Sequence, residues 1–163
     1  MRNATAAVTQ KANDAQVRIF PHSREQFPSD DLLRIWLLNG LRGRGGRYRL
    51  TSAGGGKPQN LAPGSIVLFR HGDDIVGEAV VKTGIEKEDG TERNLWSGKD
   101  EKYEAVVTFA PSSIRLYAPP LPIRRIQQYM DKDLTSAQPY YELSWQVYAH
   151  VLQETLQAGA FVS

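Results

Sequence analysis

Residues 63–82 read PGSIVLFRHGDDIVGEAVVK, and this stretch decides the fold because pattern, turn chemistry and flanking residues agree in it. After a Pro-Gly pair, a continuous apolar run spans 66–69, and β-branched residues resume over 75–81. The polar residues HGDD at 71–74 are typical of a turn. The stretch therefore predicts a β-hairpin.

The first strand of this hairpin is apolar on both faces, so it cannot face water on either side. We expect it to be central in a closed or covered sheet. In the second strand Gly77 and Ala79 are small at alternate positions, which lets a helix or another backbone approach closely. These features predict an α+β fold, a small β-barrel with flanking helices.

The chain has 163 residues, which fits one domain. We expect a disordered lead-in over 1–15, the domain over 16–157 and a tail over 158–163. The sequence has no cysteine, which excludes disulfides and thiolate metal sites, and its net charge is only +2. With no signal peptide and no apolar run long enough for a membrane span, we expect a cytoplasmic protein without a membrane partner.

The rest of the chain shows further periodic segments. The expected strands span 17–20, 48–51, 103–109 and 114–117, and the expected helices span 29–41, 122–130 and 139–157. Prolines are expected to end the first strand at Pro21 and the sheet at 119–120. Residues 42–62 and 86–102 have the composition of long surface loops.

The helix expected over 29–41 has Ser29 as its N-cap and acidic residues in its first turn. It is apolar around nearly its whole circumference, which predicts burial on all sides. Trp36 lies inside it and Trp145 lies inside the last amphipathic helix, so both are expected in the core.

Arginines alternate with glycines in the segment LRGRGGRYRL at 41–50. The guanidinium group suits bidentate contacts to phosphate or guanine, and a glycine-rich backbone can follow a nucleic-acid strand. The alternative is a solvated charged loop. The candidate phosphate-binding residues are Arg42, Arg44, Arg47, Arg49, Lys57 and Lys99.

Trp96 is a conspicuous apolar residue in an otherwise polar stretch, where an indole can stack on a base. The alternative is a tryptophan that anchors the loop. Tyr103 either joins such a site or covers the end of the barrel. Tyr48, between two arginines, either stacks on a base or sugar or belongs to the barrel.

Other motifs fail as catalytic or metal sites. The run GGGK at 54–57 is followed by proline, where a phosphate-binding loop needs serine or threonine. The three histidines lack metal-ligand spacing, and Asp73, Asp74 and Lys82 do not match the usual spacing of a metal-dependent nuclease. We therefore expect no catalytic residue, no metal and no cofactor.

Three segments carry a resemblance to a known family. They are the hairpin GSIVLFRHGDDIVGEAVV at 64–81, the segment LWSGKDEKYEAVVTF at 95–109 and the polar turn HSRE at 22–25. Together with the order of elements over 16–152, they resemble the PUA-like superfamily of small β-barrels, and specifically its EVE and YTH branches. In such families an aromatic cage holds a modified nucleobase.

The resemblance implies a PUA-like barrel whose base-binding residues are Trp96, Tyr103, Tyr48, His22 and Ser23. It implies a module, not itself an enzyme, that reads a modified, methylated base in DNA by flipping it into an aromatic pocket. We expect the recognition domain of a modification-dependent restriction system, with a nuclease fused to it or acting as its partner. The alternatives are a reader of methylated RNA and a small ASCH-like hydrolase or nuclease.

Overall fold

The computed structural model describes residues 14–51, 60–134, 139–158 and 161–162. The elements are β1 Val17–His22, α2 Asp30–Ile35, η1 Trp36–Leu41, β2 Arg47–Thr51, β3 Ile66–His71, β4 Asp74–Arg93, β5 Asp100–Phe109, η3 Pro111–Ser113, β6 Arg115–Pro122, α3 Ile123–Gln127, β7 Glu142–Leu143, α4 Trp145–Ala158 and β8 Phe161–Val162. η1 is a π-helix and η3 is a 3-10 helix. The predicted α+β class, one sheet with flanking helices, is confirmed.

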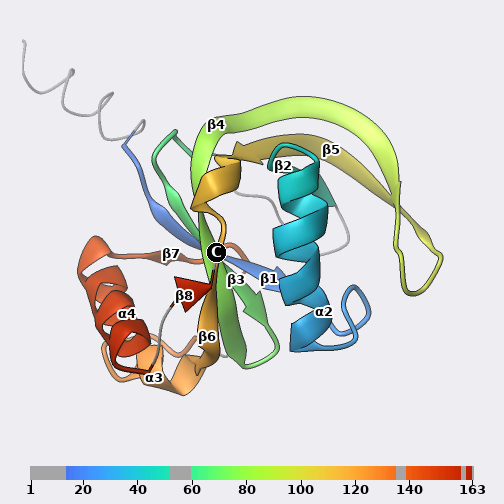
Figure 1. The fold of residues 1–163 in the computed structure, drawn as a ribbon. Coiled ribbons are helices and arrows are strands. Elements are labelled where there is room, and N and C mark those ends of the chain that lie inside the picture. Colours follow the sequence, from blue (N-terminus) through green and yellow to red (C-terminus); the bar gives the residue numbers. More distant parts are fainter. Residues whose placement is uncertain (1–13, 52–59, 135–138, 159–160, 163) are drawn as a thin grey trace, which may run out of the picture.

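The eight strands form one sheet in the order β2-β5-β4-β3-β1-β7, with β6 paired to β4 and β8 paired to β6. β1 and β3 are parallel, and the other pairs are antiparallel. β4 bends so strongly that its first part pairs with β3 and its second part arches over to pair with β5 (Figure 1). Within the described residues the ladder does not close, so the expected barrel is a curled open sheet. Residues 161–162, which we placed in a tail, form β8.

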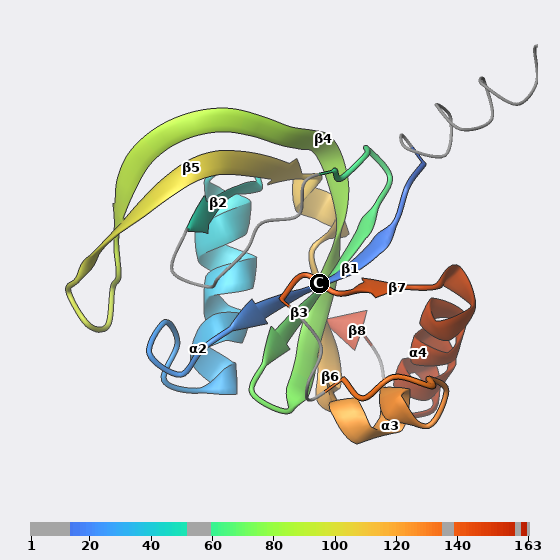
Figure 2. The ribbon, with the colours of Figure 1, turned by 180° about the vertical axis from the view of Figure 1, so that it is seen from behind.

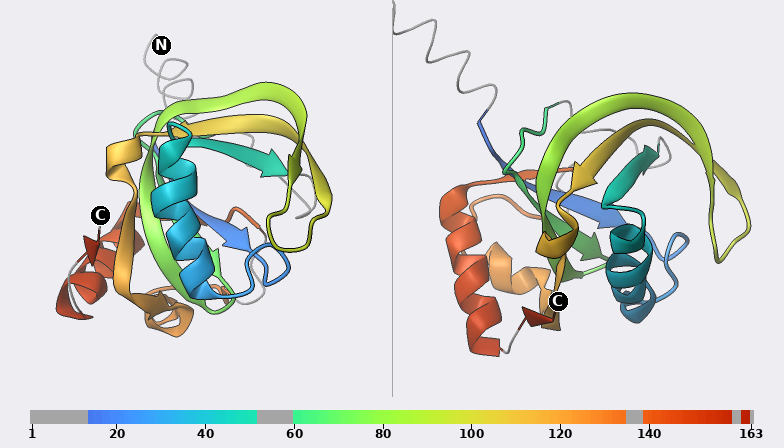
Figure 3. Two further views of the ribbon diagram at one scale, coloured as in Figure 1. Left: turned by 45° about the vertical axis from the view of Figure 1, so that its right-hand side comes forward. Right: turned by 45° about the horizontal axis from the view of Figure 1, so that its top comes forward.

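The hairpin at the centre of the sequence prediction is confirmed as β3 and β4, and β3 is buried on both faces. Val67 and Phe69 belong to the cluster that packs under the arch with α2 and η1. Leu68, between them, belongs to a second cluster with α3 and α4. The two helical layers accordingly lie on different sides of the sheet, which Figures 2 and 3 show from further directions.

Gly77 marks a close approach of two backbones, as the sequence predicted. A Cβ atom built on this glycine would lie 2.6 Å from the carbonyl oxygen of Arg115. The approaching backbone is that of β6, whose Leu116 pairs with Gly77. Any side chain at this position would force β6 away from β4.

A buried carboxylate ties the second cluster together. Glu78 accepts hydrogen bonds from the hydroxyls of Tyr117, at 2.8 Å, and Tyr148, at 2.6 Å. Arg115 donates to the same carboxylate at 3.0 Å. Burial and the neighbouring carboxylate raise the pKa of both tyrosines, so the hydroxyls stay protonated and donate. This network joins α4 to β4 and β6.

The stretch 86–102, expected as a charged loop, is instead mostly strand. β4 continues through it to Arg93 and β5 begins at Asp100, so only residues 94–99 remain as a turn. The two strands extend beyond the helices as an arm with exposed polar side chains (Figure 1). Such a ladder lacks the apolar alternation by which a half-buried strand is recognised.

The first helix begins as predicted and differs further on. The hydroxyl of Ser29 accepts from the backbone N–H of Leu32 at 3.3 Å, which confirms the N-cap. At Trp36 the α-helix gives way to η1. Ile35 is 56% exposed, so the prediction of burial around nearly the whole circumference is wrong. One stripe of the helix faces solvent, as is usual for a helix packed on one side of a sheet.

The last helix is shorter than predicted. It begins at Trp145 instead of 139, because the hydroxyl of Ser144 accepts from the N–H of Val147 at 3.1 Å and caps it. Residues 142–143 form β7 before this cap. Within the described parts of the chain, no helix has the length and apolar character that crossing a bilayer requires.

Trp145 is 46% exposed, so its expected place in the core is wrong. Its indole N–H donates to the carbonyl of Ala15 at 3.2 Å and holds the chain just before β1. Residues 1–13 of the expected lead-in lie outside the described residues.

Prolines do not end the strands where the sequence predicted. β1 runs through Pro21, which pairs with Arg70 of β3, and continues to His22. β6 likewise runs past residues 119–120 to Pro122, with a register shift in its ladder with β4 at that point.

Leu68→Ala tests the central strand. Because Leu68 is fully buried, the substitution should lower the free energy of unfolding by roughly 2 to 5 kcal/mol through lost transfer energy and a cavity. Leu156→Ala, at a leucine that is 66% exposed on α4, is the control and should change it little. Equal losses in urea unfolding of the two variants would contradict the placement of β3.

Candidate functional site

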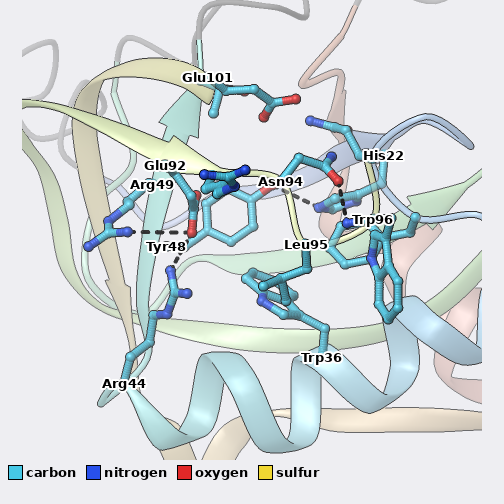
Figure 4. Close-up of a pocket in the computed structure, with 14 residues that line it drawn as sticks. His22, Trp36, Arg44, Tyr48, Arg49, Glu92, Asn94, Leu95, Trp96 and Glu101 are labelled. Carbon is cyan, nitrogen blue, oxygen red and sulfur yellow. Dashed lines mark hydrogen bonds and ion pairs between the residues drawn. The ribbon is translucent and has the colours of Figure 1, made fainter. Parts of the chain in front are cut away.

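A cavity of about 200 Å³ opens between the arm and the first helix (Figure 4). Its lining comes from the end of β1 and the loop after it, the helix α2–η1 and the residues that follow it, β2, the β4–β5 turn and the start of β5. The lining residues are His22, Gln26, Phe27, Trp36, Arg44, Tyr48, Arg49, Thr51, residues 92–96 and Glu101. Its position depends on the curl of the sheet, because the arch of β4 and β5 carries the turn back over the helix (Figure 1).

Aromatic rings form the inner wall of this cavity. The ring of Trp36 lies 5.4 Å from that of Phe27 and 6.0 Å from that of Tyr48, measured between centroids. Tyr48 in turn packs against Phe20 and Phe109 of the core, at 5.5 and 5.8 Å. The wall is therefore an extension of the core, and its rings are held in place from behind.

His22 and Tyr48 share a buried hydrogen bond whose direction can be assigned. Burial lowers the pKa of His22 to about 4, so the ring is neutral near pH 7. Its Nδ1 lies 3.1 Å from the carbonyl of Arg70, which can only accept, so Nδ1 carries the proton. Nε2 then accepts from the Tyr48 hydroxyl at 2.8 Å. The tyrosine ring is thereby fixed, and its oxygen presents only lone pairs to further partners.

At the rim of the cavity, two arginine side chains pair with Glu92. Its carboxylate binds Arg44 at 2.7 Å and Arg49 at 3.5 Å. The guanidinium of Arg44 also lies 5.7 Å from the centre of the Trp36 ring, and that of Arg49 lies 5.0 Å from the Tyr103 ring. The two arginines thus fasten the polar arm to the aromatic wall.

Trp96 lies on the β4–β5 turn and is 45% exposed. The side-chain oxygen of Asn94 accepts from the backbone N–H groups of Trp96 and Ser97, at 2.8 and 2.9 Å, and shapes the turn. Lys99 of the same turn binds the carboxylate of Glu25, in the loop after β1, at 3.2 Å. The turn is thereby tied to the loop after β1, and its indole lines the cavity (Figure 4).

Glu101 adds a second carboxylate to the cavity lining. Burial and the nearby Glu92 raise its pKa, while a hydrogen bond with Asn94 opposes the shift. The lining thus offers both cations and carboxylates beside its rings.

The five predicted base-binding residues separate into two groups. Trp96, Tyr48 and His22 line the cavity together. Tyr103 is buried under Arg49, with its ring against Gly90, and is not among the lining residues described. Ser23 is exposed, and its hydroxyl accepts from the N–H of Gln26 at 3.2 Å, which stabilises the loop.

The predicted phosphate-binding residues carry internal partners in this structure. Arg44 and Arg49 bind Glu92 as described, Arg47 binds Glu88 at 2.6 Å and Lys99 binds Glu25. Arg42 donates to the carbonyl of Ile114 at 2.8 Å, so its guanidinium is turned into the fold. Lys57 lies outside the described residues.

Sequence reasoning missed Trp36, Phe27 and the rim carboxylate Glu92 as parts of this site. Trp36 was assigned to the core because its apolar helical run does not distinguish a core face from a cavity wall. The run of small and cationic residues at 41–50 gave no sign of Glu92, since the two segments meet only through the curl of the sheet.

The residues of the nuclease alternative do not assemble with the cavity. Asp73 and Asp74 lie at the β3–β4 turn, where burial and a hydrogen bond with Asp30 raise the pKa of Asp74. The nearby His71 lies 2.5 Å from Asp30 and 2.6 Å from the carbonyl of Phe27. In the described part of the chain, no group of three or more histidine, aspartate or glutamate side chains is placed to hold a metal ion.

His22 predicts a pH dependence of stability. Its pKa falls from 6.5 in the unfolded chain to about 4 in the fold, so the unfolded state binds more protons between these values. The free energy of unfolding therefore has its full value above pH 6.5 and falls as the pH is lowered toward 4. The slope is up to about 1.4 kcal/mol per pH unit.

The measurement is urea unfolding of the parent and of His22→Gln between pH 7.5 and 4.5. The free energy of unfolding of the parent should fall more steeply with pH than that of His22→Gln, because only the parent has the buried histidine. If the free energies of unfolding of the two proteins changed equally with pH, His22 would not be held neutral in the fold.

No family model matches the chain, and no curated protein matches it. Among solved structures, the chain is similar to the YTH domain of the Zygosaccharomyces rouxii MRB1 protein in complex with N6-methyladenosine RNA. The TM-score is 0.48 and the sequence identity 12%, over 93% of this chain and 90% of that chain. The likeness concerns the arrangement of elements and assigns no ligand to this cavity.

Proposed function

We propose that this protein binds a modified base of a nucleic acid, flipped out of its strand, in the aromatic cavity. The observation that carries the proposal is the meeting of the Trp36 and Tyr48 rings with the half-exposed indole of Trp96 around one opening. Stacking of a base on such rings contributes about 1 to 3 kcal/mol per base.

The size and the rim of the cavity support a base as the ligand. Its volume of about 200 Å³ is below the range of roughly 300 to 1,000 Å³ that suits drug-sized ligands, so it favours a small planar group. The carboxylates of Glu92 and Glu101 and the guanidinium of Arg93 supply acceptors and donors for the edge of a base.

We propose DNA as the polymer and methylation as the modification, in keeping with the EVE and YTH resemblance of the sequence. The protein then acts by recognition in the cytoplasm, as the reading part of a modification-dependent restriction system whose nuclease is fused or separate. RNA with the same base is the alternative. A 2′-hydroxyl distinguishes the two, so both polymers belong in the binding experiment.

Trp96→Ala should remove selectivity. Burying one methyl group favours the modified base by about fourfold, and only a group that contacts the base senses that methyl. The variant should bind methylated and unmodified oligonucleotides equally, with weak residual affinity and a nearly unchanged melting temperature.

Trp145→Ala is the matched control, because Trp145 has almost the same exposure and begins α4, none of whose described residues lines the cavity. Anisotropy titrations of 5-methylcytosine and N6-methyladenine oligonucleotides at one salt concentration measure the preference. A preference retained in Trp96→Ala, or a loss of stability that weakens both ligands equally, would make Trp96 a loop anchor.

Phosphate contacts should appear in the salt dependence. Arg47 is half-exposed and its pair with Glu88 is exposed too, so exchange of that carboxylate for a phosphate costs little. Arg47→Ala and Lys99→Ala, the latter in a more exposed pair with Glu25, should each lower the slope of log K against log salt by about one, for modified and unmodified strands alike. Arg124→Ala, on α3, should leave the slope unchanged. Equal slopes in all three variants would place the strand elsewhere.

A further inference from the structure

Gly40 leaves the space in which the Trp36 indole lies. A Cβ atom built on Gly40 would be 2.6 Å from Cδ1 and 2.9 Å from Nε1 of that indole. Carbon atoms in real structures do not approach so closely, so the indole can take this position only because residue 40 has no side chain.

The helix at this point is unusual in two ways. Trp36 begins the π-helix η1, and Gly40 lies one turn further along in it. π-helical turns are rare and often occur at functional sites, and glycine is a poor helix former. A locally unfavourable residue in an unfavourable type of turn indicates that the position serves something other than helix stability.

The other sides of the indole are occupied or face the cavity. Phe27 and Tyr48 pack against it, and the guanidinium of Arg44 lies 5.7 Å from its centre. The indole also lines the cavity (Figure 4). Its distance from the helix backbone therefore determines how much of the cavity stays open.

We infer that Gly40, by letting Trp36 lie against the helix, sets the largest base substituent that the cavity admits. This inference rests on the proposed function and makes Trp36 the specificity-determining wall and Gly40 its positioning residue. Gly40→Ala puts a Cβ atom where the indole lies, so the ring has to move away from the helix backbone, and the cavity is the open space beside the ring. Trp36→Phe replaces the indole with a smaller ring and therefore enlarges the cavity.

The experiment uses single-stranded DNA with one cytosine, 5-methylcytosine, 5-hydroxymethylcytosine or glucosylated 5-hydroxymethylcytosine, and a parallel N6-methyladenine strand. Single strands remove the cost of breaking a base pair. Gly40→Ala should weaken the bulkier bases at least fivefold relative to unmodified cytosine. Trp36→Phe should shift the optimum to a larger substituent.

Gly43→Ala is the matched control, because a Cβ atom at Gly43 meets nothing within 4 Å. It should keep the parent ranking. Circular dichroism and thermal melting check each variant, and if Gly40→Ala does not fold, Trp36→Phe alone decides the inference.

The outcomes separate this inference from the function on which it rests. A parent protein with no preference among the bases overturns the proposed function. A parent that discriminates, with the same ranking in Gly40→Ala and Trp36→Phe, overturns the role of Gly40 and Trp36 and leaves the reader function standing.

Discussion

The burial of β3 on both faces is the constraint on which the rest of the structure depends. Because Val67 and Phe69 face one cluster and Leu68 the other, the strand needs cover on both sides. One side is covered by α2 and η1 under the arch, and the other by α3 and α4 (Figure 2). To cover β3 from the first side the sheet has to curl, and the curl brings the β4–β5 turn to the start of η1.

Charge pairing then holds the polar arm in that position. Arg44 and Arg49 meet on Glu92, and Arg47 meets Glu88, so each of these β4 carboxylates joins the arm to the segment around β2. Pairs this exposed contribute little stability each. Their effect is on placement, because they align the arm over the aromatic wall.

Local signals in the sequence predicted the hairpin and the Ser29 cap, because each depends on residues near in the chain. The small residue Gly77 predicted a close approach, but the strand that approaches it, β6, is distant in the sequence. The arm could not be predicted, since a polar strand has no apolar alternation. Trp96 could be identified because it is isolated among polar residues, whereas Trp36 is one apolar residue among many in its helix. Only the register of the curled sheet shows that Trp36 faces a cavity and that Glu92 meets the arginines.

The aromatic side chains of the cavity differ in how much conformational freedom they would lose when a ligand binds. Tyr48 is packed against the core and hydrogen-bonded to a neutral His22, so under the proposed function its ring would lose no freedom when a base stacks near it. Trp36 is likewise fixed between Phe27 and the helix backbone. Trp96, on an exposed turn, still has side-chain freedom to lose, which weakens its net contribution to affinity. Under the proposed function, the fixed rings would determine which shapes enter the cavity, and Trp96 would sense the methyl group of a base that has entered.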